Sequence, residues 1–177
     1  MSAPSGRITG LRHADHIAFT VPDLDLAVRF FVEHLGAETL YRSRRGPDPV
    51  FIPENFQMPP DTAFELAMLR LPPNLNVELF QWAGQGLRTE PPRHGDAGGH
   101  HLAFVVDDVD AAVDYLRTVP GVRVLGRVKQ VSQDSPRVAG NRWTYVMTPW
   151  GLMLELVDRS RVKDPPRLVG PSEWRQA

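Results

Sequence analysis

The chain has 177 residues, of which 42% are hydrophobic and 23% charged, the composition of an ordinary globular protein. Its net charge of −1 gives no electrostatic case for a nucleic-acid or anionic-membrane partner. The absence of cysteine excludes disulfides, thiolate nucleophiles and cysteine-based zinc sites. The opening residues MSAPSGRITG lack the apolar run of a signal peptide, and no segment approaches the roughly 20 apolar residues of a membrane span. We therefore expect a cytoplasmic protein.

The first half of the chain reads as strand, helix and three strands. A short strand begins at His16 in HIAFTVPDLDLAV (16–28), and Asp23 opens an amphipathic helix. The apolar stripe of that helix contains Leu24, Ala27, Val28 and Phe31. Three further strands are expected at 37–43, 62–71 and 76–82.

The second half repeats this order. HLAFVVDDVDAAV (101–113) is identical to residues 16–28 at eight of thirteen positions, and Asp108 opens its helix. Three more strands are expected at 122–131, 142–148 and 152–158. The sequence thus predicts an α+β fold of two tandem βαβββ modules. The expected boundaries within this one domain are 14–82 for the first module, 83–99 for a linker, 100–160 for the second module and 161–177 for a C-terminal tail.

A second repeated motif lies near the end of each module. VELF (77–80) matches LELV (154–157), which aligns Glu78 with Glu155. The displacement here is shorter than that between the two strand–helix segments by about eight residues. We place the extra residues of the first module in RRGPDPVFIPENFQMPP (44–60), as an altered lid over a site.

The repeated histidines and glutamates point to a metal site. Strand alternation turns His16, His101 and Glu155 away from the bulky row that faces a helix. A buried carboxylate without a partner is unfavourable, and a divalent cation shared with imidazoles offsets that penalty. The predicted ligands are His16, Glu78, His101 and Glu155, a donor set that suits Ni, Zn, Co, Mn or Fe.

The paired modules and this ligand order resemble the vicinal oxygen chelate superfamily over residues 14 to 158. Its members include glyoxalase I, methylmalonyl-CoA epimerase, extradiol dioxygenases, fosfomycin-resistance enzymes and bleomycin-binding proteins. The resemblance implies a cupped mixed sheet with the helices outside and the metal inside. It also implies a homodimer and a small-molecule substrate with two adjacent oxygens.

The His-Glu-His-Glu order is most similar to bacterial glyoxalase I. It implies a lyase or isomerase that moves a proton next to a carbonyl through a metal-stabilised enolate, with Glu155 or Glu78 as the catalytic base. Thr20 stands where many bacterial glyoxalases carry an arginine for glutathione, so a glutathione substrate is not implied. Methylmalonyl-CoA epimerases usually have Gln at the position of Glu78.

Several other residues are candidates for the substrate pocket. Trp143 and Tyr145 share a strand face next to the strand of Glu155, and Arg142 and Glu54 are further candidates. The arginines of YRSRRG (41–46) fit either an anionic substrate or a solvated loop. His100 is interpreted as supporting or structural, and the aspartates at the helix starts as caps.

Two alternative functions stay open. An Fe(II) extradiol-type dioxygenase would use His16, His101 and Glu155, although Glu78 then occupies a position that such enzymes keep free. A non-catalytic antibiotic-binding or natural-product-binding resistance protein would have an aromatic groove and no tightly bound metal.

Overall fold

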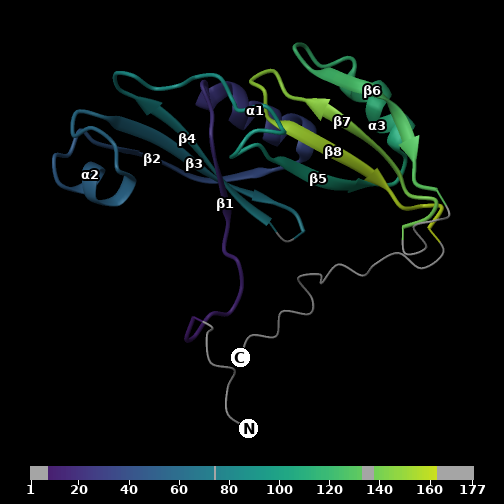
Figure 1. The fold of residues 1–177 in the computed structure, drawn as a ribbon, viewed down its shortest axis with the longest axis horizontal. Coiled ribbons are helices and arrows are strands. Elements are labelled where there is room, and N and C mark those ends of the chain that lie inside the picture. The colour runs from purple at the N-terminus through teal and green to yellow at the C-terminus, as the bar shows by residue number, and fades with distance from the viewer. Residues whose placement is uncertain (1–7, 74, 133–137, 163–177) are drawn as a thin grey trace, which may run out of the picture. The chain divides into compact units, whose positions relative to one another are not determined.

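The computed structural model describes residues 8–73, 75–132 and 138–162 (Figure 1). The chain divides into two compact units, Met1–Leu87 and Arg88–Ala177. The division falls inside the segment 83–99 that was predicted as a linker. From residue 163 onward, the predicted tail lies outside the described residues.

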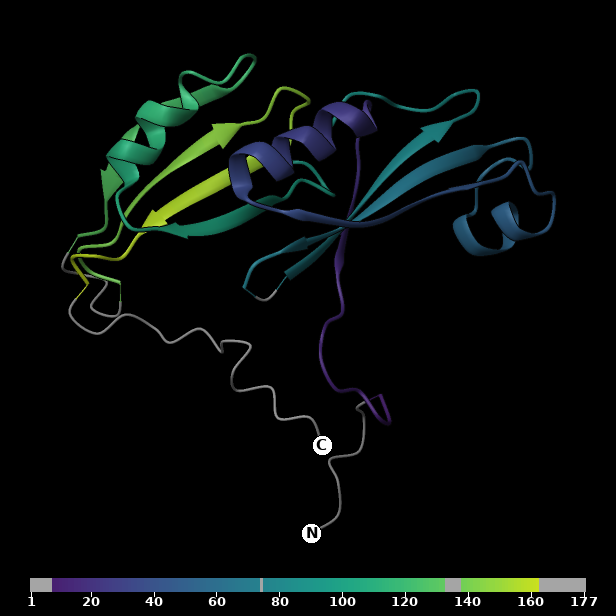
Figure 2. The same ribbon diagram turned by 180° about the vertical axis from the view of Figure 1, so that it is seen from behind.

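The first unit is a four-stranded mixed sheet with one long helix on it. Its strands follow the order β1-β4-β3-β2, with β1 parallel to β4 and the other neighbours antiparallel. The helix α1 packs on β3 and β4, and Figure 2 shows it beside the strands of this sheet. The elements are β1 (Ile17–Thr20), α1 (Leu24–Leu35), β2 (Glu38–Arg45), α2 (Phe51–Phe56), β3 (Ala63–Leu71) and β4 (Leu75–Ala83).

The second unit repeats this topology. Its strands follow the order β5-β8-β7-β6, with β5 parallel to β8 and α3 packed on β6, β7 and β8. The elements are β5 (His101–Val106), α3 (Val109–Leu116), β6 (Arg123–Gln130), β7 (Arg142–Met147) and β8 (Met153–Asp158). The predicted α+β fold of two tandem βαβββ modules is confirmed.

The aspartates at the helix starts act as caps. The Asp23 carboxylate accepts a hydrogen bond from the backbone N–H of Leu26 at 2.9 Å. Asp108 accepts from the N–H groups of Asp110 and Ala111 at 2.9 and 3.1 Å. Each carboxylate satisfies amides that have no partner inside the helix, so the capping interpretation is confirmed.

Each sheet has a face covered by its helix and a second face, here called the open face. The helix side carries the fully buried Leu79 of β4 and Leu154 of β8. Because neighbouring residues of a strand point to opposite faces, Glu78 and Glu155 lie on the open faces of their sheets. The core of each unit therefore lies between sheet and helix, and the open face is left for function.

The short helix α2 was not predicted. It lies within the insertion 44–60, and the Asp48 carboxylate holds its first turn by accepting from the N–H groups of Val50 and Phe51 at 3.0 and 2.8 Å. These hydrogen bonds, first from Phe51 and then from Val50, lower the pKa of Asp48. Ile52 of α2 is fully buried in a cluster with Phe64 and Leu66.

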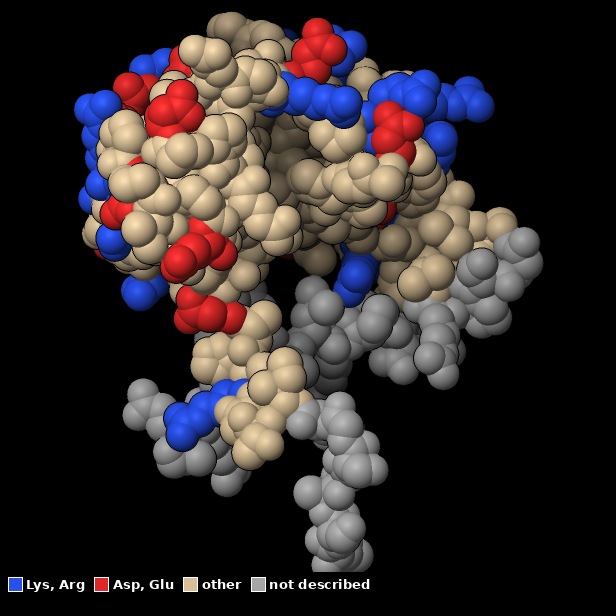
Figure 3. All heavy atoms as spheres, turned by 60° about the vertical axis from the view of Figure 1, so that its left-hand side comes forward, with Lys and Arg blue, Asp and Glu red and all other residues tan. Residues whose placement is uncertain are grey.

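The surface matches the near-neutral composition. Figure 3 shows acidic and basic side chains interspersed on the face in view. In the described part of the chain, no helix is long and apolar enough to cross a membrane.

Candidate functional site

The first half of the candidate site joins the residue before β1 to the middle of β4. The Nε2 atom of His16 lies 3.3 Å from a carboxylate oxygen of Glu78. The two strands are parallel neighbours, with Ala18 opposite Glu78 in register. Only 14% of the Glu78 side chain is exposed, so its carboxylate is largely shielded from water. On its other ring nitrogen, His16 is held by Asp15, with 2.8 Å between Nδ1 and the carboxylate.

The second unit holds an equivalent pair. The Nε2 atom of His101 lies 3.1 Å from a carboxylate oxygen of Glu155, whose side chain is 20% exposed. Here Ala103 is opposite Glu155 in the parallel pairing of β5 with β8. The Nδ1 atom of His101 contacts the Nε2 atom of His94, at 3.0 Å.

The two pairs share one chemical arrangement. In each, Nε2 of the histidine faces the carboxylate while Nδ1 is occupied by a second side chain, Asp15 or His94. Such outer partners orient metal-binding histidines and fix their tautomer. Two donors each about 2.1 Å from one ion lie about 3.0 to 3.4 Å apart at right or tetrahedral angles. The observed separations of 3.3 and 3.1 Å therefore fit two neighbouring ligands of a cation.

Each unit by itself supplies two of the predicted donors. Over residues 8–73, 75–132 and 138–162, no group of three or more His, Asp or Glu side chains is placed to hold a metal ion. His94 contacts the Nδ1 atom of His101, whereas Glu155 contacts its Nε2 atom. His94 and Glu155 therefore lie on different sides of the His101 ring. Each unit thus presents one histidine–glutamate pair, and neither unit alone holds three of the predicted donors.

Tyr145 and Trp143 lie on the open face of the second sheet. Tyr145 is the direct cross-strand neighbour of Glu155, and its ring contacts that of His101 at 5.5 Å between centroids. Trp143 packs against Tyr145 edge-on at 5.2 Å. Burial, followed by the nearby charge of Glu155, raises the pKa of Tyr145. The phenol therefore stays protonated at neutral pH and is a hydrogen-bond donor next to the carboxylate.

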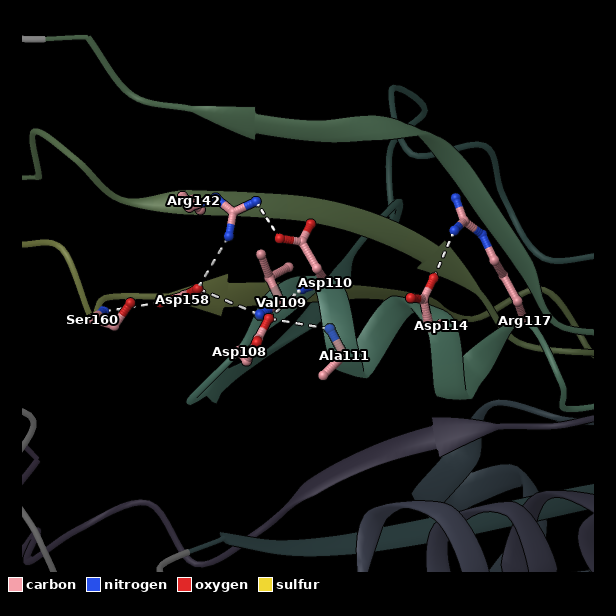
Figure 4. A network of polar contacts seen from close by, with 9 residues as sticks. All are labelled: Asp108, Val109, Asp110, Ala111, Asp114, Arg117, Arg142, Asp158 and Ser160. Atoms are coloured by element: carbon pink, nitrogen blue, oxygen red, sulfur yellow. Dashed lines mark hydrogen bonds and ion pairs between the residues drawn. The ribbon is translucent and has the colours of Figure 1, made fainter.

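Arg142 lies on the opposite face of the same strand, so its predicted role in substrate binding does not fit the structure. Figure 4 shows its guanidinium directed at Asp110, with a nitrogen–oxygen distance of 2.6 Å. A second contact reaches Asp158 at 3.7 Å. These carboxylates, with the hydrogen bond to Asp110 first, raise the pKa of Arg142. Arg142 joins β7 to α3 and β8, which is a structural role.

A cavity of about 750 Å³ lies in the first unit and includes Glu78 in its lining. Its other lining residues are Tyr41, Arg42, Ser43, Arg45, Phe51, Phe56, Phe64, Leu66 and Phe80. Glu54 of α2, predicted to contact substrate, is exposed and is not part of this lining. The insertion instead reaches the cavity through two phenylalanines.

Sequence reasoning considered His94 without finding a placement for it, and it missed Asp15 and the two phenylalanines of α2. Asp15 directly precedes His16, so adjacency was a usable signal. His94 lies in a Gly- and Pro-rich segment, RHGDAGG (93–99), in which no periodicity indicates where a side chain points. Phe51 and Phe56 carried no signal either, because the helix that presents them was read as part of a lid.

Comparisons with known proteins identify the family of the chain. A family model described as the glyoxalase/bleomycin resistance protein/dioxygenase superfamily matches residues 15–139. A 2-epi-5-epi-valiolone epimerase from Actinomyces sp is 46% identical over 151 residues, which cover 85% of this chain and 81% of that protein. An ethylmalonyl-CoA/methylmalonyl-CoA epimerase from Cereibacter sphaeroides is 34% identical over 119 residues, covering 63% of this chain and 73% of that protein.

Among solved structures, a glyoxalase family protein from Bacillus cereus superposes with a TM-score of 0.69 at 19% identity. The match covers 89% of this chain and 98% of that one, and it shows a shared fold. The two curated relatives are both epimerases, which supports an isomerase-type enzyme.

Proposed function

Because the chain belongs to the glyoxalase/bleomycin resistance protein/dioxygenase superfamily, we propose that it is a divalent-metal-dependent epimerase. It would invert a carbon next to a carbonyl of a small molecule by removing and returning a proton. The observation that carries this proposal is the duplicated pair of histidine Nε2 and glutamate carboxylate, at 3.3 Å in one module and 3.1 Å in the other. The two epimerases among its relatives support the reaction class.

The proposed ligands are the four residues of the two pairs, His16, Glu78, His101 and Glu155. Imidazole and carboxylate donors suit the ions Ni, Zn, Co, Mn and Fe, and the observed donor separations fit neighbouring ligands. When bound, the cation would supply Lewis-acid stabilisation for the oxyanion that develops on the substrate carbonyl. A histidine–glutamate hydrogen bond accounts for the same separations, so metal content is the first quantity to measure.

The two glutamates are the proposed proton-transfer groups. Inversion at a carbon requires that the proton leave from one face and return to the other, and the duplication provides two carboxylates for these steps. Their shielding, with 14% exposure for Glu78 and 20% for Glu155, keeps bulk water from competing for the proton. Tyr145, kept protonated beside Glu155, can donate a hydrogen bond to an oxygen of the substrate.

The proposal is tested by deuterium incorporation from heavy water, followed by proton NMR, after the metal content of the purified protein has been measured. The first compounds to try are those in the names of its relatives, 2-epi-5-epi-valiolone and methylmalonyl-CoA. We expect Glu155→Gln and Glu78→Gln each to slow epimerisation about a hundredfold or more, because each removes the carboxylate that serves one face of the carbon. Each single variant should still exchange the proton of the one epimer that the remaining carboxylate can reach.

Glu65→Gln is the matched control. Glu65 is a glutamate of the neighbouring strand β3 with an exposed side chain near Arg44, so its exchange rate should equal that of the unmodified protein. Undiminished epimerisation in both the Glu78 and Glu155 variants would refute the proposed roles. Iron together with oxygen uptake on catechols would favour the dioxygenase alternative.

The predicted homodimer belongs to the same proposal. Each sheet has two edge strands, β1 and β2 in the first and β5 and β6 in the second. Exposed strand edges tend to be covered by a partner. Light scattering coupled to size-exclusion chromatography measures the molar mass directly, and a value near that of one 19.9 kDa chain would rule the dimer out.

A further inference from the structure

We propose that the cavity beside Glu78 is a preformed subsite for a neutral, polyhydroxylated ring, and that α2 supplies its aromatic wall. That the occupant is the substrate rests on the proposed function. The binding chemistry of the cavity stands on its own contacts, which come from β2, α2, β3 and β4. Its volume of about 750 Å³ is large enough for a small molecule, which would lie in an open depression on the sheet.

The wall is built from aromatic rings that hold one another in place. Phe56 of α2 packs edge-on against Phe64 at 5.3 Å and against Trp82 at 5.1 Å between ring centroids. Phe51 meets Phe56 at 5.6 Å, and Phe64 meets Phe80 at 5.2 Å. Phe64 is 3% exposed and supports the wall from the core, while the half-buried rings of Phe51, Phe56 and Phe80 are accessible to a ligand. These apolar ring surfaces match a ligand ring whose C–H bonds project from its faces. The aromatic wall therefore favours a cyclic ligand with an apolar face.

The rim of the cavity on β2 is polar. Alternation along the strand places Tyr41, Ser43 and Arg45 on the open face, because each pairs with an open-face residue of β3. Arg45 lies over the ring of Phe51, with its guanidinium carbon 5.9 Å from the centroid. Hydroxyl and guanidinium groups donate hydrogen bonds, and the Glu78 carboxylate accepts them. This mixture of donors and acceptors matches the hydroxyl groups of a polyol.

The charges of the rim favour a neutral ligand. Of the β2 arginines, Arg42 is paired with Asp25 at 2.7 Å and Arg44 with Glu65 at 3.8 Å. Within the described residues Arg45 forms no ion pair, and the lining also holds one carboxylate, that of Glu78, which contacts His16. A ligand with several phosphates, such as coenzyme A, requires a cluster of uncommitted cations. The described lining offers one.

The subsite is formed before any ligand arrives. Asp48 fixes the start of α2, and Ile52 anchors the helix in the core with no exposed surface. Gly46 makes the turn between β2 and α2 at φ +82°, and a Cβ there would lie 2.7 Å from the carbonyl oxygen of Thr62. The wall is therefore held by core contacts and is not assembled by the ligand.

The test is a direct titration of the full-length protein with neutral cyclic polyols, myo-inositol and D-glucose, followed by amide chemical shifts in NMR. We expect saturable binding with shifts concentrated in β2, α2 and β4. Arg45→Gln should weaken it about tenfold, because a charged hydrogen-bond donor is lost. Phe56→Leu, which removes the ring but keeps an apolar side chain, should weaken it by a similar factor.

Arg44→Gln is the matched control, since Arg44 is the adjacent arginine on the opposite strand face. It should bind the polyols as the unmodified protein does. Thermal unfolding of each variant separates a lost contact from a lost fold. Saturable binding of coenzyme A or inorganic phosphate at this cavity, or no saturable binding of either polyol, would overturn the proposal.

Glu155→Gln distinguishes this inference from the proposed function. Glu155 belongs to the second unit and does not line the cavity, so this variant should lose epimerisation and keep polyol binding. Exchange without polyol binding would refute the subsite alone. Polyol binding in a protein that catalyses no exchange would refute the epimerase alone.

Discussion

The Nε2 atom of His94 lies 3.0 Å from the Nδ1 atom of His101, a contact between the segment before β5 and the first residue of that strand. The rings are 5.2 Å apart between centroids, and both approach Tyr145. His94 thus stands to His101 as Asp15 stands to His16 in the other module. In each module a second side chain contacts the Nδ1 atom of the candidate histidine ligand. That side chain is an aspartate in the first module and a histidine in the second.

This relationship predicts that His94 sets the metal affinity of the second pair. His94→Ala removes the group that orients His101 and should weaken metal binding about tenfold to a hundredfold. His94→Gln keeps a side chain that can hydrogen-bond to Nδ1 and should recover much of the affinity. Titration of the chelator-treated protein with Zn or Ni measures both. Equal affinities for all three proteins would contradict the positioning role.

A second prediction concerns Arg142, which the structure places away from the open face. Arg142→Gln should lower the free energy of unfolding by about 1 to 3 kcal/mol, because it leaves the nearly buried Asp158 without its cation. The KM for the substrate should not change, since Trp143 and Tyr145 project from the other face. Urea unfolding and steady-state kinetics measure the two quantities. A raised KM with unchanged stability would restore the substrate-binding role of Arg142.

The third prediction is a pH dependence of stability that comes from Asp158. Burial alone would raise the pKa of this carboxyl, but hydrogen bonds from Ser160 and Val109 and the charge of Arg142 together lower it. A pKa lower in the folded than in the unfolded chain contributes stability that is present above the ordinary value. That contribution is lost as the pH falls through the folded value, below about 4.

The substitution Asp158→Asn removes the charge of this carboxylate and so isolates its contribution to the free energy of unfolding. The variant should be less stable than the unmodified protein by about 2 kcal/mol at neutral pH. The difference between them should shrink as the pH falls below about 4, because the unmodified protein then loses the same contribution. Unfolding by urea at a series of pH values measures it. A difference that does not vary with pH would show that the charge of Asp158 is not what stabilises the fold.

The fourth prediction compares two glycines with similar backbone angles. Gly36 and Gly46 have φ values of +70° and +82°, so alanine is strained at either position by about 1 kcal/mol. At Gly36 a Cβ would meet nothing within 4 Å, whereas at Gly46 it would press on the backbone at Thr62. Gly46→Ala should therefore destabilise more than Gly36→Ala, and it alone should weaken polyol binding. Equal losses in urea unfolding would show that the turn adjusts freely.

The alternation of side chains along each strand allowed most of the predictions about which residues lie on the same face of a sheet. It placed Trp143 and Tyr145 with Glu155, and the register of β7 with β8 agrees. The same alternation assigns Arg142 to the helix side of the sheet. The orientation of its side chain could therefore have been predicted from the sequence, but the residue was instead placed among the substrate-pocket candidates. Glu54 is exposed and lies outside the cavity lining, and the direction of its side chain depends on a helix that the sequence did not reveal.

The sequence by itself predicted the repeat, the order of the strands and of the helices α1 and α3, and the four candidate ligands His16, Glu78, His101 and Glu155. These follow from local periodicity and from a duplication that preserves residue identity, so no long-range contact has to be known. Only the tertiary structure decided which residues stand behind the histidines and what lines the cavity. Those contacts join segments that lack any periodic pattern, such as the turn at His94 and the helix at Phe56. Their positions are set by packing against distant strands, as Phe56 is set by Phe64 and Trp82.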